Sequence, residues 1–133
     1  MIEQVKLIEF RENTNSQGKL VAIEGSKDIP FDIKRVFYIY GASRYAVRGC
    51  HANKQSEFVL INVCGSSKVK VKSNQFERVY IMDKPYIGLY LPKMIWKEMY
   101  DFSPDSLLLV LASEYYDKSE YINDFEDYIR NDA

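Results

Sequence analysis

The feature of this chain that most constrains its fold is a series of short runs of apolar and β-branched residues bounded by turn-forming residues. Glycine, proline, serine and asparagine separate the runs, which lie at residues 20–23, 33–40, 58–64, 68–72, 76–82, 88–91 and 107–112. Runs of this length and composition are typical of strands. Many short strands at close spacing predict an all-β sandwich or barrel.

The runs differ in how many of their faces are expected to be buried. Residues 68–72 alternate lysine and valine, which predicts that Val69 and Val71 face the interior while the lysines face water. Residues 33–40 and 107–112 are apolar at nearly every position, so both of their faces must be covered by other strands, a helix or another subunit. A partner subunit is a reasonable inference from this pattern.

The C-terminal segment has a different pattern. After Tyr116 the composition changes to Asp, Glu, Tyr and Asn, and apolar residues recur at helical spacing at Tyr121, Ile122, Phe125, Tyr128 and Ile129. This spacing predicts one short amphipathic helix at the end of the chain. Because no internal repeat or linker interrupts the sequence, residues 1–133 are expected to form a single domain.

The charge balance limits the classes of partner. The chain has 18 basic and 19 acidic side chains, which argues against a protein that binds nucleic acid by neutralising phosphates.

The sequence has no apolar segment of membrane-spanning length. The longest apolar stretch, residues 107–112, is far shorter than the roughly 20 residues that cross a bilayer, and the amino end lacks the pattern of a secretory signal. We therefore expect no nucleic-acid or membrane partner and a cytoplasmic location.

His51 is the only histidine in the chain, which excludes a metal site built from two or three imidazoles of one subunit. No run of acidic residues has the spacing of a calcium loop, so we expect no metal. If the segment 48–54 is extended, His51 and Asn53 share a face while Cys50 points the other way. This geometry disfavours a Cys50–His51 nucleophilic pair and favours an imidazole with an amide beside it. The alternative to a functional imidazole is that His51 is an ordinary core or surface histidine without a role in the site.

Several segments together resemble the sugar 3,4-ketoisomerases of nucleotide-deoxysugar pathways. The similarity includes Arg48-Gly49-x-His51-Ala52 and extends, in order, over residues 18–24, 29–36, 48–52, 88–90, 96–103, 111–117 and 121–122. The resemblance implies a cupin, an antiparallel jelly-roll β-barrel that is dimeric through exchanged or paired strands. It further implies an enzyme without metal or cofactor that moves the carbonyl of dTDP-4-keto-6-deoxyglucose from C4 to C3, a step in deoxyaminosugar synthesis for a surface glycan. By position, His51 falls on the catalytic base of that family.

The sequence departs from the family pattern at two positions, because Asn53 and Lys97 stand where relatives often have histidines. Return of the proton by His51 on its own ring face predicts a galacto product. A gluco product requires a second donor across the ring, such as a tyrosine, a water molecule or Lys97. A basic residue other than histidine at position 97 is similar to the gluco-forming branch, so we expect the gluco configuration.

The remaining candidates are assigned by side-chain chemistry. Besides His51, the catalytic candidates are Asn53 and Tyr38. The substrate-binding candidates are Arg35 and Arg48 for the diphosphate, Tyr40 and Trp96 for the base or sugar, Glu57 as a carboxylate on the nominal face of His51, and Lys97 near the sugar. The arginines have an alternative role in ion pairs with Glu24, Glu57 or Glu98, and aromatic residues in strands are more often core. A cupin that binds a nucleotide sugar without catalysis is the alternative function.

Overall fold

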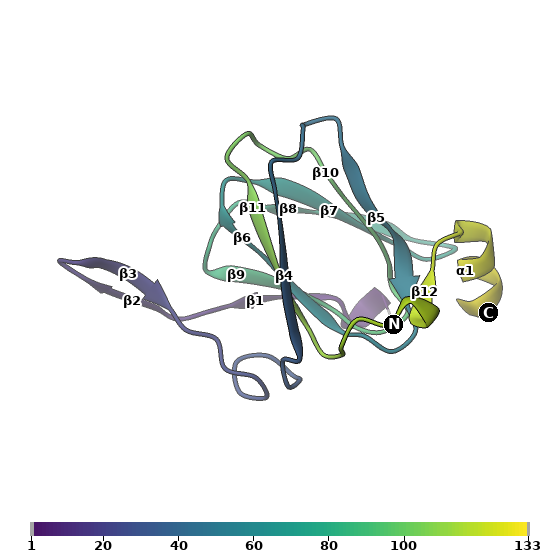
Figure 1. Cartoon of the computed structure of the whole chain (residues 1–133), viewed down its shortest axis with the longest axis horizontal. Helices are drawn as coiled ribbons and strands as arrows, with labels where there is room; N and C mark the ends of the chain where they lie inside the picture. The colour runs from purple at the N-terminus through teal and green to yellow at the C-terminus, as the bar shows by residue number, and fades with distance from the viewer. Residues whose placement is uncertain (1, 133) are drawn as a thin grey trace.

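Two five-stranded antiparallel sheets face each other in the computed structural model, which describes residues 2–132 (Figure 1). The first sheet has the strand order β1-β9-β6-β11-β4, with bounds Lys6–Glu9, Ile87–Leu91, Phe58–Cys64, Leu107–Ala112 and Arg35–Tyr40. The second has the order β12-β5-β10-β7-β8, with bounds Tyr121–Ile122, Val47–Asn53, Trp96–Tyr100, Ser67–Lys72 and Glu77–Met82. The predicted all-β jelly-roll class is confirmed.

A separate hairpin projects from this pair of sheets. Strands β2 (Glu12–Asn15) and β3 (Gly18–Val21) pair with each other and extend to one side of the body, at the left in Figure 1. Their residues are mostly exposed. The hairpin therefore has little of its surface covered within one copy of the chain.

The main core lies between the two sheets. Val69 and Val71 of β7 are fully buried there, and the alternating lysines of the same strand are only partly buried, as the alternation predicts. They pack with residues of the opposite sheet such as Phe58, Leu60 and Leu108. Burial of this apolar surface is the dominant favourable contribution to folding.

The outer face of the first sheet is only partly covered. Ile29 and Phe31, from the connection between β3 and β4, pack over Leu111, so both faces of β11 are covered by the same chain. The outer face of β4 is not covered, because Val36 is 53% exposed and Tyr40 is 71% exposed. The prediction that both faces of residues 33–40 are buried is therefore not met within one copy.

The C-terminal helix is shorter than the spacing predicts. Helix α1 spans Phe125–Asp132, and the residues before it form the 3-10 turn η2 (Lys118–Glu120) and strand β12. Tyr121 and Ile122 pair with Asn53 and Ala52 of β5, so backbone pairing prevails over the helical pattern at these positions.

A further 3-10 turn, η1, spans Ile2–Gln4. None of the helices within residues 2–132 has the length and apolar character that a membrane-spanning helix needs.

Candidate active site

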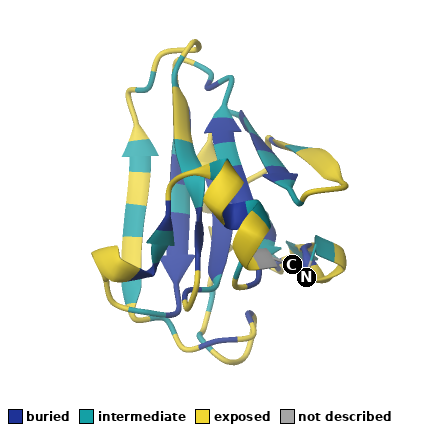
Figure 2. Cartoon of the chain, turned by 90° about the vertical axis from the view of Figure 1, so that its right-hand side faces the viewer, coloured by how far each residue is buried: buried dark blue, intermediate teal, exposed yellow. Residues whose placement is uncertain are grey.

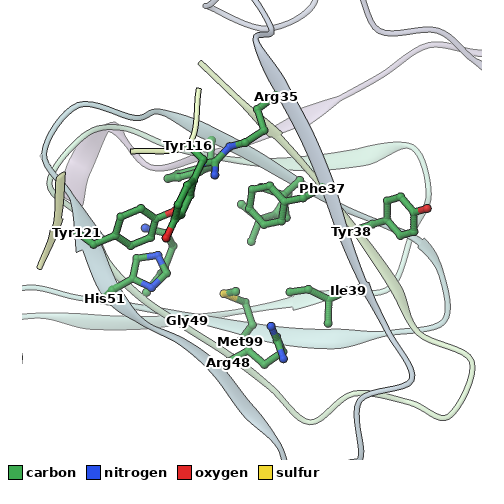
Figure 3. A pocket seen from close by; sticks show the side chains of 14 residues that line it. Arg35, Phe37, Tyr38, Ile39, Arg48, Gly49, His51, Met99, Tyr116 and Tyr121 are labelled. Carbon is green, nitrogen blue, oxygen red and sulfur yellow. The ribbon is translucent and has the colours of Figure 1, made fainter. Parts of the chain in front are cut away.

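A cavity of about 270 Å³ opens between the two sheets and contains several of the predicted site residues (Figure 3). Arg35, Phe37 and Ile39 of β4 line one wall, and Arg48, His51 and Lys97 of β5 and β10 line the other. Tyr116 and Tyr121, from the C-terminal segment, also line it. The cavity thus brings together side chains of both sheets.

A β-bulge directs His51 into the cavity. His51 is paired with Lys97 and Gly49 is paired with Glu98, so Cys50 is an extra residue without a partner on β10. Gly49 and Cys50 have φ angles of 83° and 58°, and a Cβ on Gly49 would lie 3.1 Å from the Lys97 carbonyl oxygen. Glycine at position 49 readily adopts this positive φ angle and has no Cβ that would clash with the Lys97 carbonyl oxygen. As a result, Arg48 and His51 line the same cavity although they are three residues apart.

His51 is half-buried and packs against Tyr121, with 4.7 Å between the ring centroids. Burial lowers its pKa to about 4, and the nearby Lys97 cation adds to this effect, while the Gly49 backbone and Glu120 oppose it. The imidazole is therefore neutral near pH 7. A neutral imidazole in a cavity is able to accept a proton.

Lys97 lies behind the imidazole and is almost fully buried, with 4% of its surface exposed. Its Nζ donates a hydrogen bond to Asn53 Oδ1 at 3.1 Å and lies 4.7 Å from the centre of the Phe58 ring. Burial lowers the pKa of Lys97 to about 7, although the Glu120 carboxylate favours the charged form. Asn53 thus lies between Lys97 and the Glu120 carboxylate. It is not among the residues that line the cavity.

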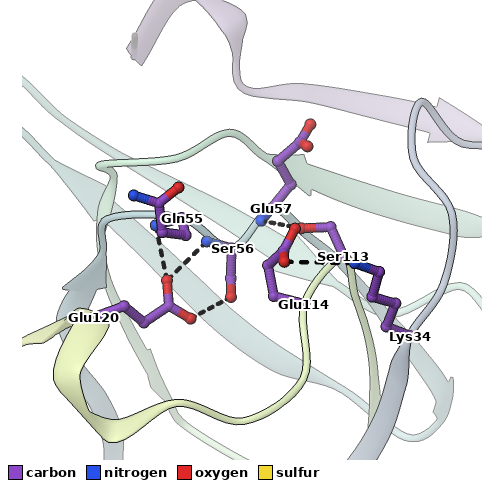
Figure 4. Close-up of polar contacts among 7 residues, drawn as sticks. All are labelled: Lys34, Gln55, Ser56, Glu57, Ser113, Glu114 and Glu120. Carbon is purple, nitrogen blue, oxygen red and sulfur yellow. Dashed lines mark hydrogen bonds and ion pairs between the residues drawn. The ribbon is translucent and has the colours of Figure 1, made fainter.

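Glu120 is a buried carboxylate with several donors (Figure 4). Its Oε1 accepts hydrogen bonds from the backbone N–H groups of Gln55 and Ser56, both at 2.8 Å, and its Oε2 accepts one from the Ser56 hydroxyl. Burial alone would raise the pKa of Glu120, but these donors lower it below its usual value. Asn53 contributes too, as a nearby amide dipole, since its Nδ2 makes no hydrogen bond within the described residues.

Arg35 provides a second positive charge, on the wall opposite His51 (Figure 3). Its guanidinium lies over the rings of Phe37 and Tyr116, at 5.0 and 5.5 Å from their centres. Its Nε and Nη2 are buried and have no hydrogen-bond partner among residues 2–132. Burying charged N–H donors without hydrogen-bond partners costs folding free energy, and a bound anion would supply those partners. The Arg35 guanidinium is therefore well placed to bind an anion. Arg48 is exposed at the edge of the same cavity.

Two predicted tyrosines do not point into the cavity. Tyr38 borders it, but its ring lies on the far side of β4 from Phe37 (Figure 3). Tyr40 stacks on Tyr38 with 6.1 Å between centroids and is not part of the lining. Strand alternation explains this, because Arg35, Phe37 and Ile39 take the inward positions of β4. Within one copy the structure therefore does not place the ring of Tyr38 or Tyr40 where it would act on a ligand in the cavity, and their roles stay predictions.

Glu57 and Trp96 also lie elsewhere. Glu57 Oε1 accepts a hydrogen bond from the Tyr90 hydroxyl at 2.6 Å, so this carboxylate does not orient His51. Trp96 packs on Phe125 and Tyr128 of the C-terminal helix, and its Nε1 donates to Glu98 at 2.9 Å. Trp96 precedes the cavity-facing Lys97 on β10, so it points to the opposite face.

Tyr116, Tyr121 and Glu120 were not among the predicted site residues. Glu120 and Tyr121 come from the segment after Tyr116 in which apolar spacing predicts a helix, and the position of Tyr121 depends on the pairing of β12 with β5. Tyr116 precedes that segment and lies against Arg35. Within residues 2–132, no group of three or more His, Cys, Asp or Glu side chains is placed to hold a metal ion. The arrangement offers instead a neutral base, a buried amine and an unpaired arginine around one cavity, which suits proton transfer on an anionic substrate.

Comparison with known proteins gives consistent matches. The family model FdtA, described as WxcM-like, C-terminal, matches residues 3–132. A TDP-4-oxo-6-deoxy-alpha-D-glucose-3,4-oxoisomerase from Aneurinibacillus thermoaerophilus is 42% identical over 123 residues, which are 92% of this chain and 88% of that protein.

Two crystal structures of one bacterial protein resemble the fold closely. QdtA, a sugar 3,4-ketoisomerase from Thermoanaerobacterium thermosaccharolyticum in complex with TDP, is 43% identical with a TM-score of 0.96, over 98% of this chain and 96% of that one. A histidine-to-asparagine mutant of QdtA in complex with TDP-4-keto-6-deoxyglucose is 42% identical with a TM-score of 0.95, over 98% and 95% of the two chains.

Proposed function

We propose that this chain, which belongs to the FdtA (WxcM-like, C-terminal) family, moves the keto group of dTDP-4-keto-6-deoxyglucose from C4 to C3. The chain is a sugar 3,4-ketoisomerase, and its reaction class is isomerisation. The observation that carries the proposal is the neutral imidazole of His51 facing a cavity that also contains an unpaired arginine.

In the proposed reaction His51 removes the proton from C3 of the sugar. The electron pair of the C–H bond forms a C3–C4 double bond, and the C4 carbonyl oxygen becomes an enediolate oxygen. A proton then passes from the oxygen on C3 to the oxygen on C4, and C4 accepts a proton as the new C3 carbonyl forms. Hydrogen is removed and returned with no net oxidation, so acid–base groups suffice.

The cations of the cavity suit the charged diphosphate of this substrate and the negative charge that develops on the sugar during the reaction. The guanidinium of Arg35 has two buried nitrogens free for a phosphate or sugar oxygen, and Arg48 at the edge is able to reach a diphosphate that extends outward. Lys97 lies beside His51 on the adjacent strand, where a positive charge stabilises a developing enediolate. Asn53 acts through Lys97, to which it is hydrogen-bonded.

We infer that the product has the gluco configuration at C4. A gluco product needs a donor across the ring from His51, and Lys97 is on the strand next to His51. Tyr116 lies against the guanidinium of Arg35, which is on the wall opposite His51, so we assign the return of the proton to C4 to the Tyr116 hydroxyl. A ketone at C3 is a substrate for transamination, which is the class of reaction expected to consume this product.

The direct test is isomerisation in deuterated water, followed by proton NMR of dTDP-4-keto-6-deoxyglucose. We expect the C3 proton signal to disappear and deuterium to enter C4. A parallel reaction in H2O, in which C4 receives a proton, should show a coupling between the C4 and C5 protons that matches a gluco product. A control without enzyme corrects for spontaneous exchange. Binding of the nucleotide sugar with no exchange would instead indicate a cupin without catalysis, and a galacto product would reject the stereochemical inference.

We also propose that the chain forms a homodimer in which a second copy covers the outer face of β4. Val36, Tyr38 and Tyr40 form an exposed apolar face there, and β4 is the edge strand of its sheet. Exposed apolar edges of this kind are usually covered in the functional state. The projecting β2–β3 hairpin is a second surface that another copy is able to cover (Figure 1).

Placing a charge on this face tests the dimer. Val36→Glu should shift the mass measured by light scattering from that of a dimer toward that of a monomer, because an ionised carboxylate resists burial. Val79→Glu is the matched control, since Val79 is exposed on the outer strand of the other sheet. A wild-type protein that is monomeric at micromolar concentration would contradict the proposal.

A further inference from the structure

We propose that Glu120 is a positioning residue of this active site, whose buried negative charge, fixed in the segment next to the Asn53–Lys97 pair, stabilises the cationic form of Lys97 beside His51. The inference rests on the proposed function, because it concerns the groups that surround the base. None of the sequence patterns pointed to Glu120. Its assignment comes from its burial and its contacts.

Glu120 is held in one position by groups from a distant part of the chain. The backbone N–H groups of Gln55 and Ser56 and the Ser56 hydroxyl donate to its carboxylate (Figure 4). The Glu120 carbonyl oxygen also accepts a hydrogen bond from the Lys54 N–H at 3.0 Å. Both its side chain and its backbone therefore connect η2 to the loop after β5. Only 4% of the residue is exposed, so water screens its charge weakly.

This position places the charge next to the catalytic groups. The loop of residues 54–56 follows directly after Asn53, whose Oδ1 accepts from Lys97. Tyr121, the next residue after Glu120, is paired with Asn53 and has its ring against His51. The carboxylate, the amide and the amine thus form a short polar series behind the imidazole.

The charged groups around this series have opposing effects. His51 faces Lys97 on β10 and Arg35 on β4, which both disfavour its protonation, and Glu120 in η2, which favours it. Lys97 is nearly surrounded by protein, and Glu120 is the charged group that favours its protonated form. Loss of the Glu120 charge should therefore lower the pKa of both His51 and Lys97.

A purely structural role for Glu120 would have a different consequence. A carboxylate that only connects two loops affects stability, and the loss of activity would then be the same at every pH. A carboxylate that keeps Lys97 charged affects the alkaline limb of the pH profile, because activity falls where Lys97 loses its proton. The pH dependence of kcat/KM separates the two roles.

The experiment compares Glu120→Gln with wild type by measuring kcat/KM from about pH 5 to pH 9. Glutamine is of similar size, its carbonyl oxygen still accepts from both backbone groups, and its NH2 is able to donate to the Ser56 hydroxyl. We expect the alkaline limb to move to lower pH. For each pH unit of that shift, kcat/KM measured at a pH on the alkaline limb falls about tenfold. Activity near pH 6 should fall much less.

Matched variants make the result specific. Glu57→Gln removes another hydrogen-bonded carboxylate, one that contacts Tyr90 and not the cavity, and should leave the pH profile unchanged. Glu120→Asp keeps the charge and should restore the position of the alkaline limb. A Glu120→Gln profile lowered equally at every pH would overturn the inference. A wild-type enzyme that does not exchange the ring proton would overturn the proposed function instead.

A second measurement applies if Glu120→Gln does not fold. Carbon-13 NMR of the wild-type protein follows the Glu120 carboxyl and the Lys97 Cε directly through the pH range. We expect an ionised Glu120 throughout and a Lys97 titration near pH 7. A Glu120 that is protonated at neutral pH, or a Lys97 that is already uncharged near pH 6, would contradict the inference.

Discussion

Replacement of His51 by asparagine is expected to lower kcat by about 10²- to 10⁴-fold, the usual contribution of a general base. His51 is the only histidine of the chain and lines the cavity with its imidazole in the neutral form, so no other imidazole of the same subunit is available to take over. Asparagine retains a polar side chain of similar reach but has no titrating nitrogen. Exchange of the C3 proton in deuterated water measures the loss directly.

Ligand binding is the internal control for this variant. TDP affinity, measured by calorimetry, should change little, because the diphosphate is assigned to the arginines rather than to the imidazole. In wild type, kcat/KM should show no decline that is due to His51 until the pH approaches about 4, where its imidazole becomes protonated. Proton exchange by His51→Asn at the wild-type rate would show that another group is the base.

Replacement of Arg35 by methionine is expected to weaken binding of TDP-4-keto-6-deoxyglucose by about 10- to 100-fold, the range for loss of hydrogen bonds to a charged group. Two guanidinium nitrogens of Arg35 are buried without a partner within residues 2–132, and an anion in the cavity would satisfy them. Methionine keeps the apolar contact with Phe37 and Tyr116 but cannot donate.

The same variant should not reduce the stability of the free enzyme. Removing a desolvated cation that has no partner relieves a cost of folding, so the Tm without ligand should stay the same or rise while ligand-induced stabilisation is lost. Arg44→Met is the control, because Arg44 also lies over an aromatic ring but outside this cavity. Unchanged affinity together with a lower Tm would mean that Arg35 is structural.

The parts of the fold predicted correctly are those specified by local patterns. The runs at 58–64 and 107–112 coincide with β6 and β11, and the alternation around Val69 and Val71 gives their burial without knowledge of the fold. His51 and Asn53 are within one strand, as expected, and Arg35 and Lys97 line the cavity. The period of the strand is sufficient for Val69 and Val71, and side-chain chemistry for Arg35, whereas His51 and Lys97 are assigned to the site by the family resemblance.

The parts predicted incorrectly depend on register and on contacts between distant segments. Glu57 is predicted on the nominal face of His51, but a loop separates the two strands and the Glu57 carboxylate instead contacts Tyr90, which is 33 residues away. β1, β2 and β10 contain too many polar residues for an apolar-run criterion to find. Tyr121 has helical spacing in the sequence, yet its backbone completes a sheet edge.

The bulge at Cys50 makes the backbone conformation between Arg48 and His51 as much a property of the site as the two side chains. In a regular strand, side chains three positions apart lie on opposite faces, so Arg48 and His51 share the cavity only while the bulge is formed. A redesigned protein that kept both side chains and their spacing but replaced Gly49 with a residue that disfavours its positive φ angle would turn either the base or the edge arginine away from the cavity. Redesign of enzymes of this type should therefore treat the glycine before the bulge as a residue of the site.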